Sequence, residues 1–157
     1  MAITVREALQ VYPFEQCQVV AGENGLDRLI SGLTVMEAPD SVNWLKGGEM
    51  VLTIGYMCKD SPDFLCTLLD KLNQAKVAGL GIKFNRYIPC LPLTVKEKAK
   101  KIAFPILEIP YDLGWMDIFT GLYKYLLDEE AKIKYHAQQV SALFMNILLE
   151  NKGIQSL

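Results

Sequence analysis

With 157 residues, the chain is long enough for one folded domain and one appended element. Its 51% apolar and 22% charged residues are ordinary for a globular protein, so a buried core is expected. The 16 basic and 18 acidic residues give a net charge of −2, which argues against a nucleic-acid-binding surface, because such surfaces are normally basic.

The cysteines and the single histidine predict neither a metal site nor a disulfide framework. Cys17, Cys58, Cys66 and Cys90 are irregularly spaced, no C-x-x-C motif occurs, and His136 is distant from all four in sequence. We therefore expect all four to be buried, reduced thiols in a cytoplasmic protein. The N-terminus lacks the apolar core of a signal peptide, and no apolar run approaches about 18 residues, so no membrane association is expected.

The first part of the chain predicts one short helix and two strands. A T-x-x-E motif at 4–7 has the spacing of a capping box, which predicts a helix over 5–11 that ends before a proline. Strands are expected over 17–22 and 29–38, the second with a bulge or bend at Gly32. Both strands are expected to extend or cap the main sheet.

A regular alternation of strands and helices follows. Strands are expected over 49–55, 78–84 and 105–110. A helix is predicted to begin with Ser61 as its N-cap and to stop near Gly79, and a second capping box, Thr94 to Glu97, opens a helix to about residue 103. This order is typical of right-handed crossovers, so we predict an α/β fold with a small, mostly parallel sheet.

A long C-terminal helix is predicted from Asp117, acting as N-cap, to about residue 151. Apolar residues recur along it at heptad spacing, although Glu129 and His136 interrupt the pattern. The predicted seam consists of Leu122, Leu126, Ile133, Val140, Leu143 and Ile147. Because such a helix is too long to bury its apolar stripe on a small sheet, we expect a homodimer. The predicted division is therefore an α/β domain over 1–115 and a dimerisation and linker helix over 116–157.

Several segments in order resemble one known family. They are TVREAL (4–9), VVAGENGLDRLISGLTVMEAPDSVNWLKGGEMVLTIG (19–55), GIKFNRYIPCLP (81–92), FPILEIPYDLGWMDI (104–118) and ALFMNILLENKGIQSL (142–157). With these segments the chain resembles the N-terminal sensory domain of PucR-type regulators of purine catabolism. The resemblance implies a small-molecule effector from purine breakdown, such as an allantoin-like ureide. It also implies DNA binding only through a C-terminal domain that follows a middle domain, both absent from this chain.

Candidate ligand-binding residues cluster where parallel strands are expected to end, because open α/β sheets bind ligands beyond the carboxyl ends of their strands. Thr53, Gly55 and Tyr56 lie at the end of one strand, where a role in ligand binding and a purely structural strand terminus are equally good interpretations. Gly47 and Gly48 precede that strand on the opposite edge, so a structural turn is favoured for them.

Other candidates follow the neighbouring strands. Glu37 and Asp40 carry carboxylates suited to the N–H groups of a ureide or purine, although the structural interpretation, a strand-end acid and a turn-forming aspartate, is favoured for them. Lys83 and Arg86 could bind a carboxylate or carbonyl, but exposed loop charges are common.

No feature of the sequence predicts an enzyme or a cofactor. The single histidine lies far from any expected cleft, no nucleophile–base pair is visible, and neither a Walker A motif nor G-x-G-x-x-G occurs. The main alternative to a sensor domain is an interaction module that binds another protein or domain and no metabolite.

Overall fold

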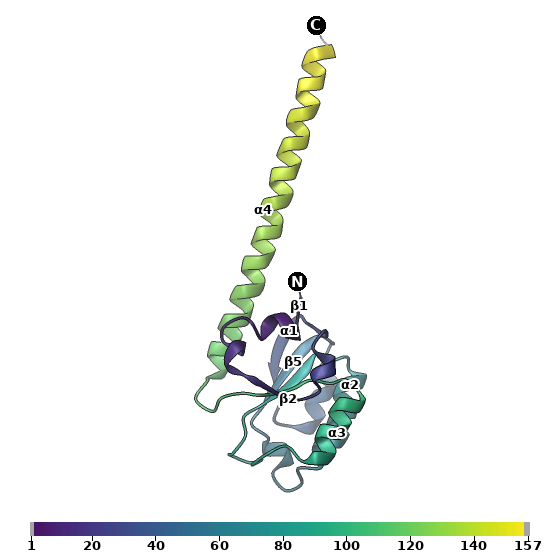
Figure 1. Cartoon of the computed structure of the whole chain (residues 1–157), viewed down its shortest axis with the longest axis vertical. Helices are drawn as coiled ribbons and strands as arrows, with labels where there is room; N and C mark the ends of the chain where they lie inside the picture. The colour runs from purple at the N-terminus through teal and green to yellow at the C-terminus, as the bar shows by residue number, and fades with distance from the viewer. Residues whose placement is uncertain (1, 156–157) are drawn as a thin grey trace. The chain divides into compact units, whose positions relative to one another are not determined.

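A five-stranded sheet organises the part of the chain that precedes the long C-terminal helix (Figure 1). The computed structural model describes residues 2–155. Its strands are β1 (Ile3–Thr4), β2 (Gln18–Ala21), β3 (Leu29–Ile30), β4 (Gly32–Val35), β5 (Glu49–Thr53), β6 (Gly79–Ile82) and β7 (Ile106–Glu108). The main sheet has the order β2-β7-β6-β5-β4, in which all neighbours are parallel except β2 and β7. The predicted mostly parallel α/β fold is confirmed.

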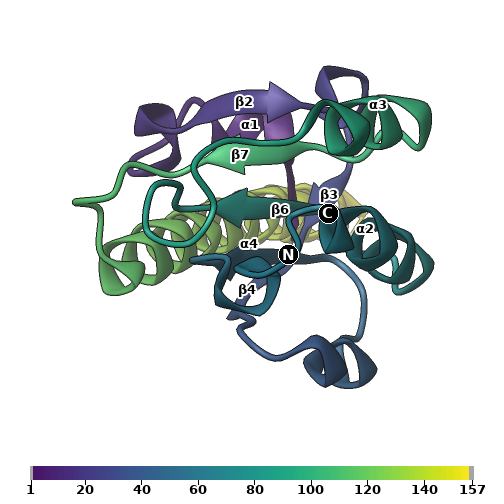
Figure 2. The same ribbon diagram turned by 90° about the horizontal axis from the view of Figure 1, so that it is seen from below.

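Helices connect these strands. The α-helices are α1 (Val5–Ala8), α2 (Phe64–Gln74), α3 (Leu93–Lys101) and α4 (Trp115–Gln155). Short 3₁₀ helices, η1 (Phe14–Gln16), η2 (Glu23–Gly25), η3 (Pro39–Trp44) and η4 (Tyr56–Cys58), lie in the connections. Figure 2 shows β2, β7, β6 and β4 one below another, with α3 and α2 together at the right.

One face of the sheet packs against α2 and α3. The leucines of α2 recur at helical spacing and are fully buried: Leu65, Leu68, Leu69 and Leu72. They share one core with alternate strand residues such as Val51, Leu80 and Ile106, and with Val95 of α3. Each fully buried leucine contributes about 1.5–3 kcal/mol relative to exposure, so this face supplies much of the stability of the fold.

The other face of the sheet carries the intervening strand residues. Leu52 and Leu107 alternate with residues of the α2–α3 core and are themselves buried. The start of α4 belongs to this second layer, since Ile118 and Leu122 are buried outside the α2–α3 core. The hydroxyl of Tyr123 accepts a 3.1 Å hydrogen bond from the backbone N–H of Leu33 in β4. Consequently the chain that follows β6 runs to the face covered by α2 and α3, whereas the chain that follows β7 runs to the opposite face.

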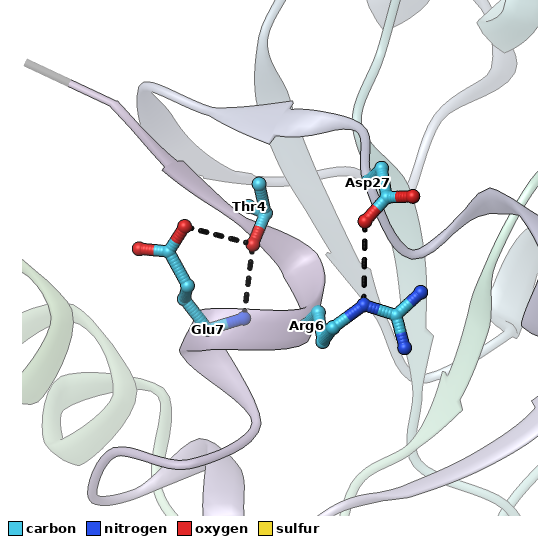
Figure 3. A network of polar contacts seen from close by, with 4 residues as sticks. All are labelled: Thr4, Arg6, Glu7 and Asp27. Carbon is cyan, nitrogen blue, oxygen red and sulfur yellow. Dashed lines mark hydrogen bonds and ion pairs between the residues drawn. The ribbon is translucent and has the colours of Figure 1, made fainter.

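Thr4 caps α1 as predicted, although only the N-cap half of the predicted capping box forms (Figure 3). The Thr4 hydroxyl oxygen accepts a 3.0 Å hydrogen bond from the N–H of Glu7 and donates a 3.2 Å bond to the Glu7 carboxylate. The helix ends at Ala8 rather than at residue 11, since the chain turns toward Pro13. Figure 3 also shows the exposed ion pair of Arg6 with Asp27, 3.2 Å apart.

Three predicted helix starts are wrong. Asp63, not Ser61, precedes α2, and the Ser61 carbonyl accepts the N–H of Phe64 in a preceding turn. The second capping box does not form, because the Thr94 hydroxyl lies inside α3 and donates to the Asp63 carboxylate at 3.0 Å. Asp117 lies in the first turn of α4, where its carboxylate accepts a 3.3 Å bond from the N–H of Gly114.

Two predicted strand features also need correction. The segment 29–38 is not one strand, because β3 pairs with β1 in a separate two-stranded sheet and only β4 joins the main sheet. Gly79 is the first residue of β6 rather than a helix stop, since α2 has already ended at Gln74. Elsewhere, the register of β2 against β7 shifts between Val19 and Ala21.

The chain divides into two units at Tyr123 and Lys124, so α4 begins in the first unit and forms the second. Of the predicted seam, Leu122 and Leu126 have little exposed surface. The remaining four members are exposed: Ile133, Val140, Leu143 and Ile147. None of the helices within 2–155 has the length and apolar character needed to cross a membrane.

Candidate ligand site at the carboxyl end of the sheet

The carboxyl end of the sheet comprises the loops that follow β5, β6 and β7, together with the start of the antiparallel β2. Glu37, Thr53 and Gly55 come together there. The Thr53 hydroxyl is fully buried, donates a 2.5 Å hydrogen bond to the Glu37 carboxylate and accepts one from the Gly55 N–H at 3.0 Å. The same carboxylate accepts the Ile54 N–H at 3.1 Å. These groups satisfy one another, so they fix the end of β5.

The prediction that all four cysteines are buried is wrong for two of them, because Cys66 is half-buried and Cys90 is exposed. The network of Glu37 and Thr53 influences one of the two buried thiols. Cys58 is buried in η4, and burial raises its pKa to about 11, with the negative charge of Glu37 acting in the same direction. The thiol therefore stays protonated and unreactive at neutral pH.

Tyr56, the next candidate, belongs to an exposed cluster of aromatic and basic side chains. Its ring meets Tyr87 edge-on, with centroids 5.1 Å apart. The Lys59 ammonium donates a 3.1 Å bond to the Tyr56 hydroxyl, and the Arg86 guanidinium lies 5.4 Å from the Tyr87 ring centroid. The structure thus brings Tyr56 and Arg86 to the same surface, with Tyr87 between them.

Lys83 points to a different neighbourhood. Its ammonium lies 4.5 Å from the centroid of the Trp115 ring. Partial burial lowers the pKa of Lys83, while the charges of Asp112 and Asp117 oppose that shift. Lys83 therefore links the end of β6 to the start of α4.

Asp40 lies apart from the other candidates. It belongs to η3 and lines an open hollow beside the C-terminal half of α2, together with Lys71 and Gln74. No ligand-binding arrangement joins Asp40 to Glu37.

Gly47 and Gly48 form a turn at the amino end of the sheet, where both have positive φ values, +103° and +85°. The Glu49 carboxylate accepts the N–H groups of Lys46 and Gly47 at 2.8 and 2.6 Å. The N–H of Gly48 donates to the Lys76 carbonyl at 2.9 Å. Because these donors are engaged, the turn offers none of them to a ligand.

Arg28, also at the amino end, was not singled out from the sequence. Its guanidinium donates to the carbonyls of Val77, Ile102 and Ala103 and to the Asn73 side chain, at 2.6–3.1 Å. These acceptors lie at or shortly after the C-termini of α2 and α3, so one cation ties together the segments in which both crossover helices end. Burial lowers the pKa of Arg28. Its position within GENGLDR gave no local signal for this role.

The sequence also failed to indicate a pocket of about 270 Å³ at the carboxyl ends of β6 and β7. Its lining combines amide, carboxylate and aromatic side chains: Gln16, Gln18, Phe84, Asn85, Glu108, Ile109, Pro110 and Tyr111. Glu108 is the last residue of β7 but lies inside the strand predicted over 105–110, so the strand-end rule that selected Glu37 would have selected it only if the strand end had been predicted correctly. Gln16 and Gln18 carry no such signal, because only the pairing of β2 with β7 brings them there.

Metal binding has no support in the described residues, since no three His, Cys, Asp or Glu side chains within 2–155 are grouped to hold an ion. The site offers only hydrogen bonding, charge and aromatic contacts to a ligand.

Comparison with known proteins identifies the family. Residues 7–126 match the PucR family, described as the purine catabolism regulatory protein-like family. The chain belongs to the PucR family. The purine catabolism regulatory protein of Bacillus subtilis (strain 168) is 32% identical over 155 residues, which cover 99% of this PucR-family chain and 29% of that protein. The transcriptional activator PmfR of Paenarthrobacter nicotinovorans is 27% identical over 105 residues, 67% of this chain and 22% of that protein.

One relative of this PucR-family chain is a regulatory protein and the other a transcriptional activator, which agrees with the prediction of a non-enzymatic protein. The chain spans less than a third of the length of either relative.

Proposed function

We propose that this chain is the N-terminal regulatory part of a PucR-family transcription regulator, which senses a small metabolite of purine breakdown and dimerises through α4. The observation that carries the proposal is the similarity of nearly the whole chain to under a third of a purine catabolism regulatory protein. DNA binding is assigned to a part of the full-length protein outside this chain, in keeping with the net charge of −2.

Effector sensing is supported by the polar groups gathered at the carboxyl end of the sheet. Thermal unfolding should be recorded with purines, allantoin and allantoate. A ligand that binds only the folded chain stabilises it by about 2.7 kcal/mol at a hundred times its Kd, so a true effector raises Tm. If none of these compounds raised Tm, the sensing role would be lost.

Dimerisation is supported by the exposed apolar residues of α4. Val140→Glu places a charge in the seam and should convert a dimer to a monomer in sedimentation velocity. Gln138→Glu, at an exposed position on the outer face of the heptad, is the matched control and should leave the dimer intact. A Val140→Glu chain that remained dimeric would refute the seam.

DNA binding by a separate part of the protein is tested by comparing this chain with the full-length regulator on the same promoter DNA. Only the full-length protein should shift the DNA in a gel. Equal binding by the isolated chain would overturn the assignment.

An interaction module is the second candidate, and one observation favours it. Exposed apolar side chains on the last part of α4 spread over more of the helix surface than a two-stranded seam uses. They include Phe144, Met145, Leu148 and Leu149. If Leu149→Glu left the dimer intact but abolished regulation by the full-length protein, this segment would dock another domain.

A further inference from the structure

The topology of the sheet singles out one position for a ligand. In open α/β sheets, a crevice forms where the chain leaves adjacent parallel strands toward opposite faces. From β4 through β6 the connections lead to η3, α2 and α3, and the buried residues of α2 and α3 belong to one core. After β7 the chain turns instead to the other layer, with Ile118 and Leu122. The crevice is therefore expected between the ends of β6 and β7.

The pocket of about 270 Å³ occupies this position. Phe84 and Asn85 come from the loop after β6, and Glu108 to Tyr111 come from the end of β7. A smaller pocket of about 140 Å³ adjoins it, shares Phe84 and Glu108, and adds Lys96 of α3. We call these two neighbouring pockets the β6–β7 crevice. Two independent features, strand topology and cavity shape, thus coincide.

The polar side chains of the crevice are free to accept a ligand. Glu108 and Gln18 are cross-strand partners in the β2–β7 ladder, which places their side chains next to each other. Within the described part of the chain, neither these two side chains nor those of Gln16 and Asn85 have a hydrogen-bond partner in the protein. Glu37 and Thr53, in contrast, satisfy each other.

The chemistry of these groups defines the ligand class. The Glu108 carboxylate accepts N–H donors, whereas the amide groups of Gln16, Gln18 and Asn85 can pair with an edge that alternates N–H and C=O. The Lys96 ammonium adds a donor for a carbonyl oxygen. Phe84 and Tyr111 supply apolar surface suited to a flat molecule.

We propose that the β6–β7 crevice binds a small planar lactam or cyclic ureide, which donates N–H groups to Glu108 and uses its carbonyls on the amide side chains. The proposal rests on the proposed sensing function and specifies where and by which chemistry sensing occurs. In this proposal the ligand site consists of residues of the crevice and not of the candidates Glu37, Thr53 and Arg86 that were selected from the sequence.

Hydantoin, the simplest cyclic ureide, is the probe, and 1,3-dimethylhydantoin is the matched control of the same ring without N–H groups. Titrations of the ¹⁵N-labelled chain should move the backbone amide signals of Phe84, Asn85, Glu108, Ile109 and Tyr111. Hydantoin should bind in the millimolar range, as expected for a fragment of this size, and the dimethyl compound at least about tenfold more weakly.

Glu108→Gln should weaken hydantoin binding about tenfold or more, because it removes a charged acceptor while keeping the shape of the side chain. Glu97→Gln, the same change on an exposed face of α3, should bind hydantoin as the unmodified chain does. Retained folding of both variants is checked by their spectra.

Three results would refute the crevice as the ligand site. The first is that both hydantoins bind equally well or that neither binds, and the second is that the signal changes centre on Glu37 and Ile54. The third is that Glu108→Gln binds hydantoin with unchanged affinity. Effector-induced stabilisation accompanied by any of these results would leave the sensing function standing. Binding of hydantoin in the crevice without any metabolite response of the full-length regulator would instead refute the sensing function alone.

Discussion

The two ends of the sheet are both rich in polar residues, yet they differ in where those residues direct their hydrogen bonds. At the amino end, Arg28, Glu49 and the Gly47–Gly48 turn bond to the protein's own backbone. At the carboxyl end, Glu108 and Gln18 face a pocket. Polar groups of the first kind hold the fold together, and groups of the second kind can serve a ligand. Substituting a group of the first kind should lower the free energy of unfolding, whereas substituting a group of the second kind should leave it nearly unchanged.

The largest expected effect is at Arg28. Arg28→Ala leaves three backbone carbonyls that follow α2 and α3 without their donor and should lower the free energy of unfolding by about 3 kcal/mol, measured by urea denaturation. Arg6→Ala is the matched control, because its ion pair with Asp27 is exposed and should contribute under about 1 kcal/mol. Similar losses in both variants would remove the special role of Arg28.

Gly48 should come next. Its φ of +85° disfavours a side chain, and a Cβ atom there would lie 2.2 Å from the Ser31 hydroxyl oxygen. Gly48→Ala should cost about 2 kcal/mol, whereas Gly47→Ala, with its nearest contact at 3.4 Å, should cost about 1 kcal/mol. Combining Gly48→Ala with Ser31→Gly should recover part of the loss, and failure to do so would show that the contact is not the cause.

Thr53 tests whether a residue at the carboxyl end can be architectural. Thr53→Val keeps the side-chain volume but leaves the Gly55 N–H and part of the Glu37 carboxylate without a partner. The expected loss is about 1.5 kcal/mol in the same denaturation experiment. If Thr53→Val left the free energy of unfolding unchanged, Glu37 and Thr53 would again be candidates for binding a ligand.

Glu108 should show the smallest effect. Glu108→Gln breaks no hydrogen bond within the described part of the chain, so its free energy of unfolding should change by less than about 0.5 kcal/mol. A loss comparable to that of Thr53→Val would erase the contrast between the two ends of the sheet.

The sequence was sufficient for the parallel core but not for every helix start. The leucines of α2 and the strands around it can be recognised in the sequence, because buried apolar residues recur there at the spacing of a helix or a strand. Capping signals are weaker, since the same T-x-x-E motif caps α1 at Thr4 but places Thr94 inside α3, bonded to Asp63. The bond from Thr94 to Asp63 is a contact between α3 and the start of α2, and no local sequence pattern indicates it.

The candidate residues predicted from the sequence and the proposed crevice lie at the same end of the sheet but are different residues. Strand-end reasoning found Glu37 and Thr53, which bond to each other, because spacing along the chain does not reveal mutual satisfaction. The crevice depends on Gln18 lying beside Glu108, a pairing between segments far apart in sequence. It also depends on which face the chain reaches after β7, and this requires knowledge of where α4 begins to pack.

The hydroxyl of Tyr123 has a consequence beyond the packing of α4. By accepting the Leu33 N–H, it occupies a donor that β4 would otherwise present outward as an edge strand. At the opposite edge, the register shift in β2 twists the backbone away from the regular spacing that an incoming strand needs. Both margins of the sheet thus resist strand addition, which protects the chain against edge-to-edge aggregation.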